Sequence, residues 1–208
     1  MSDVQVQLQP GGYYHIYNHA VGTDKLFEKE KDYLYFLSKL KTHVLPVSEI
    51  ISYCLIPNHF HLVVRIKSFA EVEEFLKNKF GEEKFKKKKT ADSYFLSQQI
   101  SKQYSNLFNT FSKHINFWKG RTGTLFKRNF RRKEIQDMAY LLRLISYIHQ
   151  NPIDAGLVSQ AQQWKYSSYA ALLSDKPTLI PRKEIIDLFG GLENLKYFHL
   201  KRTEIQID

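Results

Sequence analysis

The spacing of apolar residues predicts alternating strands and helices in the first third of the chain. Aromatic and β-branched residues predict a strand over 13–20. Apolar positions at helical spacing predict an amphipathic helix over about 28–42. Two further strands are expected over about 48–55 and 59–67, and the Pro57-Asn58 turn between them is typical of a tight hairpin. The predicted order is therefore β-α-β-β.

The middle of the chain has a different pattern. Residues 69–92 run from acidic to lysine-rich, which predicts a short helix followed by a basic loop around 84–89. Apolar positions along one side then predict a long helix over about 94–117. A glycine-containing break leads into 124–135, where basic and aromatic residues alternate in a manner suited to an exposed strand edge.

A second amphipathic helix is predicted from Met138 to about Gln150, with Asp137 as its N-cap. Pro152 disfavours helical geometry at the residue before it, so we expect this helix to unwind at Asn151.

The remaining pattern predicts a helical end to the chain. Two modest helices are expected over 182–189 and 192–200. The organisation predicted is one domain over 12–173, with the charged stretch 69–92 as an insertion, and a C-terminal tail over 174–208.

Composition narrows the class of partner. The 208 residues include 31 Lys and Arg against 21 Asp and Glu, which gives a net charge of +10. This balance favours a polyanionic partner, with nucleic acid ahead of a membrane. The single cysteine, Cys54, excludes an internal disulfide and a cysteine-rich zinc site and indicates a reducing cytoplasm. No apolar run or signal-peptide pattern predicts a membrane span or secretion.

The hairpin contains the residues with the clearest chemistry. In His59-Phe60-His61, strand alternation sends both imidazoles to one face of the sheet and the phenyl ring to the other. The imidazole face continues with Arg65 and Lys67, which are suited to binding phosphate. A pair of histidines is more often hydrogen-bonded within the fold or exposed at the surface. A catalytic metal site therefore also needs a third ligand and a nucleophile.

The helix that starts at Met138 contains candidates for both. Tyr147 is followed three and four residues later by Gln150 and Asn151, so either amide can share a helical face with the phenol. A helical tyrosine taken alone is more often a packing residue.

The densest basic cluster lies among aromatic residues just before this helix. Such a combination suits phosphates and unstacked bases, although an exposed strand edge would explain part of it. Its basic members are Lys127, Arg128, Arg131, Arg132 and Lys133.

Five segments together resemble the single-tyrosine HUH transposases, in particular the REP-associated branch. They span roughly residues 12 to 170 in the family's order. The segments are Gly12-Tyr13-Tyr14-His15-Ile16-Tyr17-Asn18, Cys54 to Val64, Gly123 to Phe130, Tyr147 to Val158, and Trp164-Lys165-Tyr166-Ser167-Ser168-Tyr169.

The resemblance implies an α+β fold, a ferredoxin-like antiparallel sheet flanked by helices. It implies that His59 and His61 are the paired metal ligands and that Tyr147 is the nucleophile. The third ligand falls on Asn151, with Gln150 as a fallback. Two departures are His19, where the family often has arginine, and the lysine-rich insertion.

The expected activity is a Mg²⁺- or Mn²⁺-dependent DNA transposase that cleaves and rejoins single-stranded or hairpin DNA through a phosphotyrosine. Histidine pairs also accept Zn²⁺ or Ni²⁺. Two alternatives stay open: a catalytically silent binder of structured repeat DNA, and an HUH replication initiator or relaxase that nicks DNA. Monomer and homodimer are both open as well.

Overall fold

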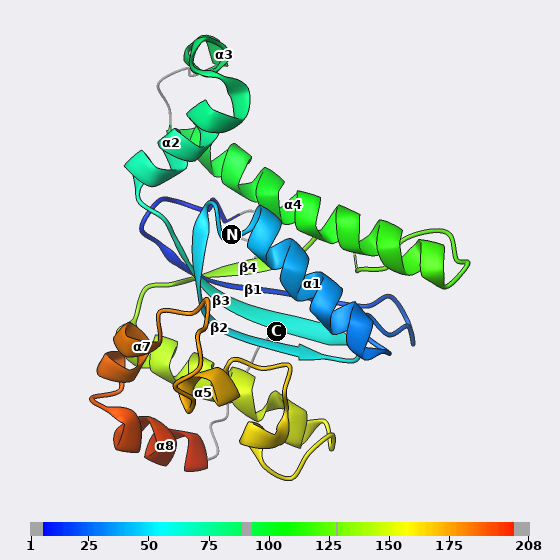
Figure 1. The fold of residues 1–208 in the computed structure, drawn as a ribbon, viewed down its shortest axis with the longest axis vertical. Helices are drawn as coiled ribbons and strands as arrows, with labels where there is room; N and C mark the ends of the chain where they lie inside the picture. The colour runs from blue at the N-terminus through cyan, green and yellow to red at the C-terminus, as the bar shows by residue number, and fades with distance from the viewer. Residues whose placement is uncertain (1–5, 89–92, 128, 202–208) are drawn as a thin grey trace.

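A computed structural model gives the fold and describes residues 6–88, 93–127 and 129–201 (Figure 1). One antiparallel sheet lies between two layers of helices, so the α+β class expected from the sequence is confirmed. The strands are β1 (Tyr13–His19), β2 (Ser48–Ile56), β3 (His59–Ile66) and β4 (Arg131–Ile135). Their order is β2-β3-β1-β4, which places β3 and β1 at the centre and β4 at an edge.

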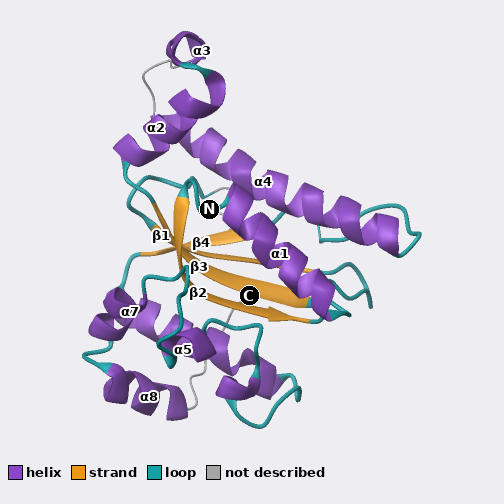
Figure 2. Ribbon diagram, viewed as in Figure 1, coloured by secondary structure: helices purple, strands orange, loops and turns teal. Residues whose placement is uncertain are grey.

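The helices cover both faces of this sheet, as Figure 2 shows. On one side α4 packs against α1, and on the other α5 packs against β2 with the C-terminal helices beyond it. The longer helices are α1 (Glu30–His43), α2 (Phe69–Phe80), α4 (Ser93–Trp118) and α5 (Met138–Asp154). The shorter helices are α3 (Glu82–Lys88), α6 (Tyr169–Leu172), α7 (Arg182–Leu188) and α8 (Leu192–Leu200), with a 3₁₀ turn at Ala161–Gln163.

The hairpin forms as predicted, but β3 is buried on both faces. Phe60, Leu62 and Val64 are each fully buried, as expected for the stripe that faces the core. On the other face, Val63 is also fully buried and His61 is only 3% exposed. The two faces of a strand are both apolar when helices cover both sides of the sheet. The middle of the imidazole face is therefore covered, while His59 and Arg65 near the two ends of β3 are half-buried.

Two local predictions are wrong. Helix α5 does not unwind at Asn151, because it continues through Pro152 to Asp154. Proline removes one helical hydrogen bond, but the Ala155 amide still donates to the Asn151 carbonyl at 2.9 Å, so the last turn forms around Pro152. The basic stretch expected as a loop is helical from Glu82 to Lys88, where Glu82 forms an i,i+4 ion pair with Lys86 at 2.9 Å.

Of the C-terminal helices, α8 packs against α5 and α7 packs against α6 and α8. Asp137 caps α5 as predicted, since its carboxylate accepts hydrogen bonds from the Ala139 and Tyr140 amides at 3.1 and 2.9 Å.

None of the helices in the described part of the chain combines the length and apolar character needed to cross a bilayer.

Candidate active site

The paired imidazoles of β3 lie beneath α5. In the sheet register, His59 pairs with His19 of β1, and His61 pairs with Tyr17, so these four side chains share one face. The ring centroids of His59 and His61 are 5.0 Å apart, and the rings are nearly perpendicular. His19 stacks on His59 with a centroid distance of 4.5 Å. The structure thus brings together the two histidines predicted from their spacing.

Asn151 joins the imidazoles from α5. Its Nδ2 donates a hydrogen bond to the Tyr147 carbonyl at 3.0 Å, which holds the side chain along its own helix. Its Oδ1 then faces His59, 3.2 Å from Nε2. On its other side, Nδ1 of His59 lies 3.0 Å from Oδ1 of Asn58. A neutral imidazole has one N–H, so it can donate to only one of these two amide oxygens.

Tyr147 stands one helical turn before Asn151, on the same face of α5. Its ring centroid is 6.3 Å from that of His61, and the side chain is half-buried. Burial raises the pKa of the Tyr147 phenol above its usual value of 10.0, and the Asn151 side chain opposes this rise. The phenol therefore lies beside the imidazole pair in its protonated form, and it is not enclosed in the interior.

Gln150 faces another part of the molecule. Its Nε2 donates hydrogen bonds to the carbonyls of His199 and Lys201, at 3.2 and 2.7 Å. The fallback ligand thus ties α5 to the end of α8, and Asn151 is the amide that meets the imidazoles.

The histidines of this face are neutral near pH 7. Burial lowers the pKa of His59, and it lowers the pKa of His61 well below 6.5 with help from the neighbouring His15. Burial likewise lowers the pKa of His15 to about 3 and of His19 to about 4. Neutral imidazoles retain the lone pair that binds a metal ion.

A metal ion in this region would need the Asn151 amide. Within the described ranges, no group of three or more His, Cys, Asp or Glu side chains is arranged to hold a metal ion. The candidate donors that meet at this face are His59, His61 and Asn151, two nitrogens and one amide oxygen.

Three of the predicted DNA contacts lie beside the imidazole face. Lys127 and Arg131 lower the pKa of His19 through their charge, and Lys133 does the same to His15. All three are exposed. Arg131 and Lys133 are on the edge strand β4, opposite Tyr17 and His15 in register. A basic rim therefore runs along the edge of the sheet next to the histidines.

Other predicted contacts lie elsewhere. Arg65 forms ion pairs with Glu49 of β2 at 2.5 Å and Glu184 of α7 at 2.6 Å. Its guanidinium therefore connects two parts of the chain, which differs from the phosphate contact predicted for it. Lys67 is half-buried just after β3. Arg128 lies outside the described residues.

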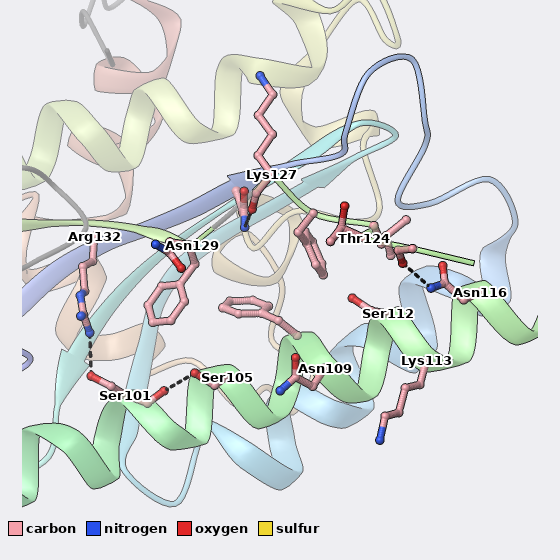
Figure 3. Close-up of a pocket in the computed structure, with 16 residues that line it drawn as sticks. Ser101, Ser105, Asn109, Ser112, Lys113, Asn116, Thr124, Lys127, Asn129 and Arg132 are labelled. Atoms are coloured by element: carbon pink, nitrogen blue, oxygen red, sulfur yellow. Dashed lines mark hydrogen bonds between the residues drawn. The ribbon is translucent and has the colours of Figure 1, made fainter. Parts of the chain in front are cut away.

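Arg132 faces the opposite side of the sheet from Arg131, because neighbouring strand residues alternate. Its Nη1 donates to Ser101 Oγ of α4 at 2.6 Å, at one end of a groove of about 830 Å³ (Figure 3). Serine and asparagine side chains of α4 line this groove, and Phe108, Phe126 and Phe130 contribute to it. In Figure 3, the Lys127 side chain points away from α4. The basic cluster is thus divided between two faces.

Sequence reasoning missed the buried partners of the site. His15 places Nε2 at 2.9 Å from Nδ1 of His61. On the opposite side of α5, His149 lies 2.8 Å from His199 and 2.7 Å from the Ser168 hydroxyl. The position of His15 on the same strand face as Tyr17 was a visible signal. The partners of His149 are distant in sequence and left no local pattern.

Comparison with known proteins supports the fold. The chain is similar to a solved structure of a REP-associated tyrosine transposase bound to a REP hairpin, with a TM-score of 0.60 and 14% sequence identity. The match covers 85% of this chain and 89% of that chain. No family model matches the sequence, and no curated protein matches it. At this identity the likeness shows that the two chains share a fold.

Proposed function

We propose that the protein is a metal-dependent transposase that cleaves and rejoins single-stranded, hairpin-containing DNA in the cytoplasm. The observation that carries the proposal is the meeting of Tyr147, the His59–His61 pair and the Asn151 amide at one face of the sheet. These residues come from β3 and from α5, which are far apart in the sequence. The shared fold with a tyrosine transposase adds support.

The donor set fits a divalent cation such as Mg²⁺ or Mn²⁺. When His59 donates from Nδ1 to Asn58, its Nε2 lone pair faces the Asn151 oxygen at 3.2 Å, so two acceptors face each other without a proton between them. Neighbouring ligands of an octahedral ion with bonds of about 2.1 Å lie about 3 Å apart. Such an ion, when bound, supplies positive charge for the scissile phosphate and for the phenolate.

The nucleophile in this proposal is the Tyr147 oxygen. It loses its proton to solvent and forms a bond to the phosphorus, and the bond from phosphorus to the 3′ oxygen breaks, so that the 3′ oxygen leaves and takes a proton from solvent to become a 3′-hydroxyl. The new phosphotyrosine retains the ester, and a second 3′-hydroxyl reverses the step to join the strands. The raised pKa of the phenol means that cleavage depends on cations brought close to it.

The basic rim of Lys127, Arg131 and Lys133 contacts the phosphate backbone of the bound DNA strand. Phosphate contacts of this kind give affinity that falls steeply with salt. The groove along α4, with its three phenylalanines and amide side chains, offers stacking surfaces for unpaired bases on the other face.

The test is a covalent adduct. A labelled hairpin oligonucleotide is incubated with the protein and Mn²⁺ and resolved on a denaturing gel, where a slow band that disappears with Tyr147→Phe supports the proposal. Tyr140→Phe is the matched control, because Tyr140 lies two turns earlier on the same helix. That variant should keep the adduct.

Two results would change the assignment. Binding of many hairpins without any adduct would identify a silent binder of structured DNA. An adduct that survives Tyr147→Phe and disappears with Tyr140→Phe would identify Tyr140 as the nucleophile in place of Tyr147. A replication initiator or relaxase would nick DNA without joining a second strand end, which a strand-transfer assay with two oligonucleotides detects.

A further inference from the structure

His15 is the buried neighbour of the site that the proposed chemistry does not use. It lies on β1, is 0% exposed, and places its Nε2 at 2.9 Å from Nδ1 of His61. Its ring also stacks against Tyr17, with a centroid distance of 4.5 Å. Among the described residues, its other nitrogen, Nδ1, has no hydrogen-bond partner.

The contact with His15 decides which nitrogen of His61 can bind a cation. Because Nδ1 of His61 faces His15, only Nε2 remains to meet a cation beside His59 and Asn151. A neutral imidazole has one N–H, so Nε2 offers a lone pair only when the proton is on Nδ1. His61 must then donate from Nδ1, and the His15 Nε2 must accept.

We propose that His15 is a positioning residue that holds His61 in the Nδ1–H tautomer and so directs its Nε2 to the cation. This inference rests on the proposed metal site. Metal-binding histidines generally donate their second N–H to an outer partner, most often a carboxylate, a carbonyl or water. Here the partner is a neutral imidazole buried in the sheet.

An imidazole suits this position because it can serve both states of the site. With a cation bound, His15 accepts at Nε2 and has its own proton on Nδ1. Without a cation, the reverse arrangement is available, in which His15 donates from Nε2 and His61 has its proton on the nitrogen that faces Asn151. No neighbour in the described part of the chain forms a hydrogen bond to Nδ1 of His15 that would fix one tautomer. Both tautomers of the pair are therefore open, and the proton follows the occupancy of the site.

The experiment measures Mn²⁺ affinity directly. The metal-free protein is titrated with Mn²⁺, and the electron paramagnetic resonance signal of the free ion is followed. His15→Phe keeps an aromatic ring and removes the acceptor, so affinity should fall about ten- to a hundredfold, the range found for outer-shell partners. His15→Gln restores an acceptor near Nε2 and should stay within about threefold of the unaltered protein.

His114→Phe is the matched control for loss of a histidine. His114 lies on α4, on the other side of the sheet, where it stacks on Tyr35 at 3.7 Å, and its Nε2 is also buried without a hydrogen-bond partner among the described residues. This variant should bind Mn²⁺ as tightly as the unaltered protein. Circular dichroism establishes that each variant is folded.

The outcomes separate this inference from the proposed function. If the unaltered protein binds no Mn²⁺, both the proposed metal site and the proposed role of His15 are overturned. If it binds Mn²⁺ and His15→Phe binds equally well, only the inference on His15 is overturned. Should His15→Phe fail to fold, ¹⁵N spectra of the unaltered protein with Zn²⁺ decide: a protonated Nδ1 in His61 supports the proposal, and a metal-bound Nδ1 overturns it.

Discussion

Mild acid should destabilise this protein, because its histidines are neutral when folded. The pKa of each of the eight histidines is lowered from 6.5, mainly by burial. An unfolded histidine titrates near 6.5, so below that pH the unfolded chain binds more protons than the folded chain. The contribution to stability is complete above about pH 6.5 and declines as the pH falls toward the folded pKa values.

The size of the effect follows from the two pairs of buried rings. His15 is 0% exposed with a pKa of about 3, and His199 is 8% exposed with a pKa of about 4. Each contacts a second buried histidine, His61 or His149, whose pKa is also lowered, so one proton for each pair is a lower bound. Each pair should lose about 2 kcal/mol at pH 5 relative to pH 7.5, or about 4 kcal/mol together. Domains of this kind have only about 5–15 kcal/mol of stability in total.

Urea unfolding in the presence of a chelator measures this dependence. Midpoints and slopes followed by circular dichroism at several pH values between about 7.5 and 5 give the free energy of unfolding, and its pH derivative counts the protons taken up. Carboxylates titrate mostly below this window, so the slope reports on histidines. We expect an uptake of at least about two protons near pH 5. A free energy of unfolding that stays constant over this range would refute the reasoning.

Five further substitutions test the roles of residues on β3, β4 and α5. Arg65→Met should lower the free energy of unfolding by about 1 kcal/mol, because its ion pairs are partly exposed, and should leave hairpin affinity in a gel shift unchanged. Arg131→Met should instead weaken that affinity and its salt dependence, and the reverse result would make Arg65 the DNA contact. Gln150→Ala should keep Mn²⁺ affinity while Asn151→Ala loses it, and equal losses would contradict the assignment of the third ligand. His149→Leu should cost about 3 kcal/mol in urea unfolding, because it leaves buried polar neighbours without a partner, and a cost near zero would contradict that network.

Local patterns predicted the elements that hold the site. Strand alternation placed His59 and His61 on one face, and helical spacing placed Tyr147 and Asn151 together, because both arguments depend only on backbone geometry. The expected break at Asn151 was wrong for a reason that is also local. The preference against helical geometry before a proline is a tendency, and the bond from the Ala155 amide to the Asn151 carbonyl at 2.9 Å keeps the last turn helical.

Partners distant in the sequence could not be predicted in the same way. Arg65 is basic and lies on the imidazole face, and nothing near it in the chain reveals Glu184, which is 119 residues away. Gln150 and Asn151 are adjacent amides with equal chemistry. Only the packing of α8 decides that one is used by the C-terminal segment and the other by the imidazoles.

Helix α5 uses neighbouring positions for different partners, and this arrangement explains how a tyrosine can be held beside the imidazoles. Tyr147 and Asn151, four residues apart, face β3. His149, between them, lies within hydrogen-bonding distance of the hydroxyls of Ser52 and Ser168 at 3.0 and 2.7 Å, so the opposite side of the same turn is fixed to the sheet. A helix held by buried polar contacts on one side cannot rotate without breaking them, and each unpaired buried group would cost about 1–3 kcal/mol. The direction of the phenol is therefore set by residues that never touch the site, and repacking around His149 should change the geometry at Tyr147 even when His59, His61 and Asn151 are intact.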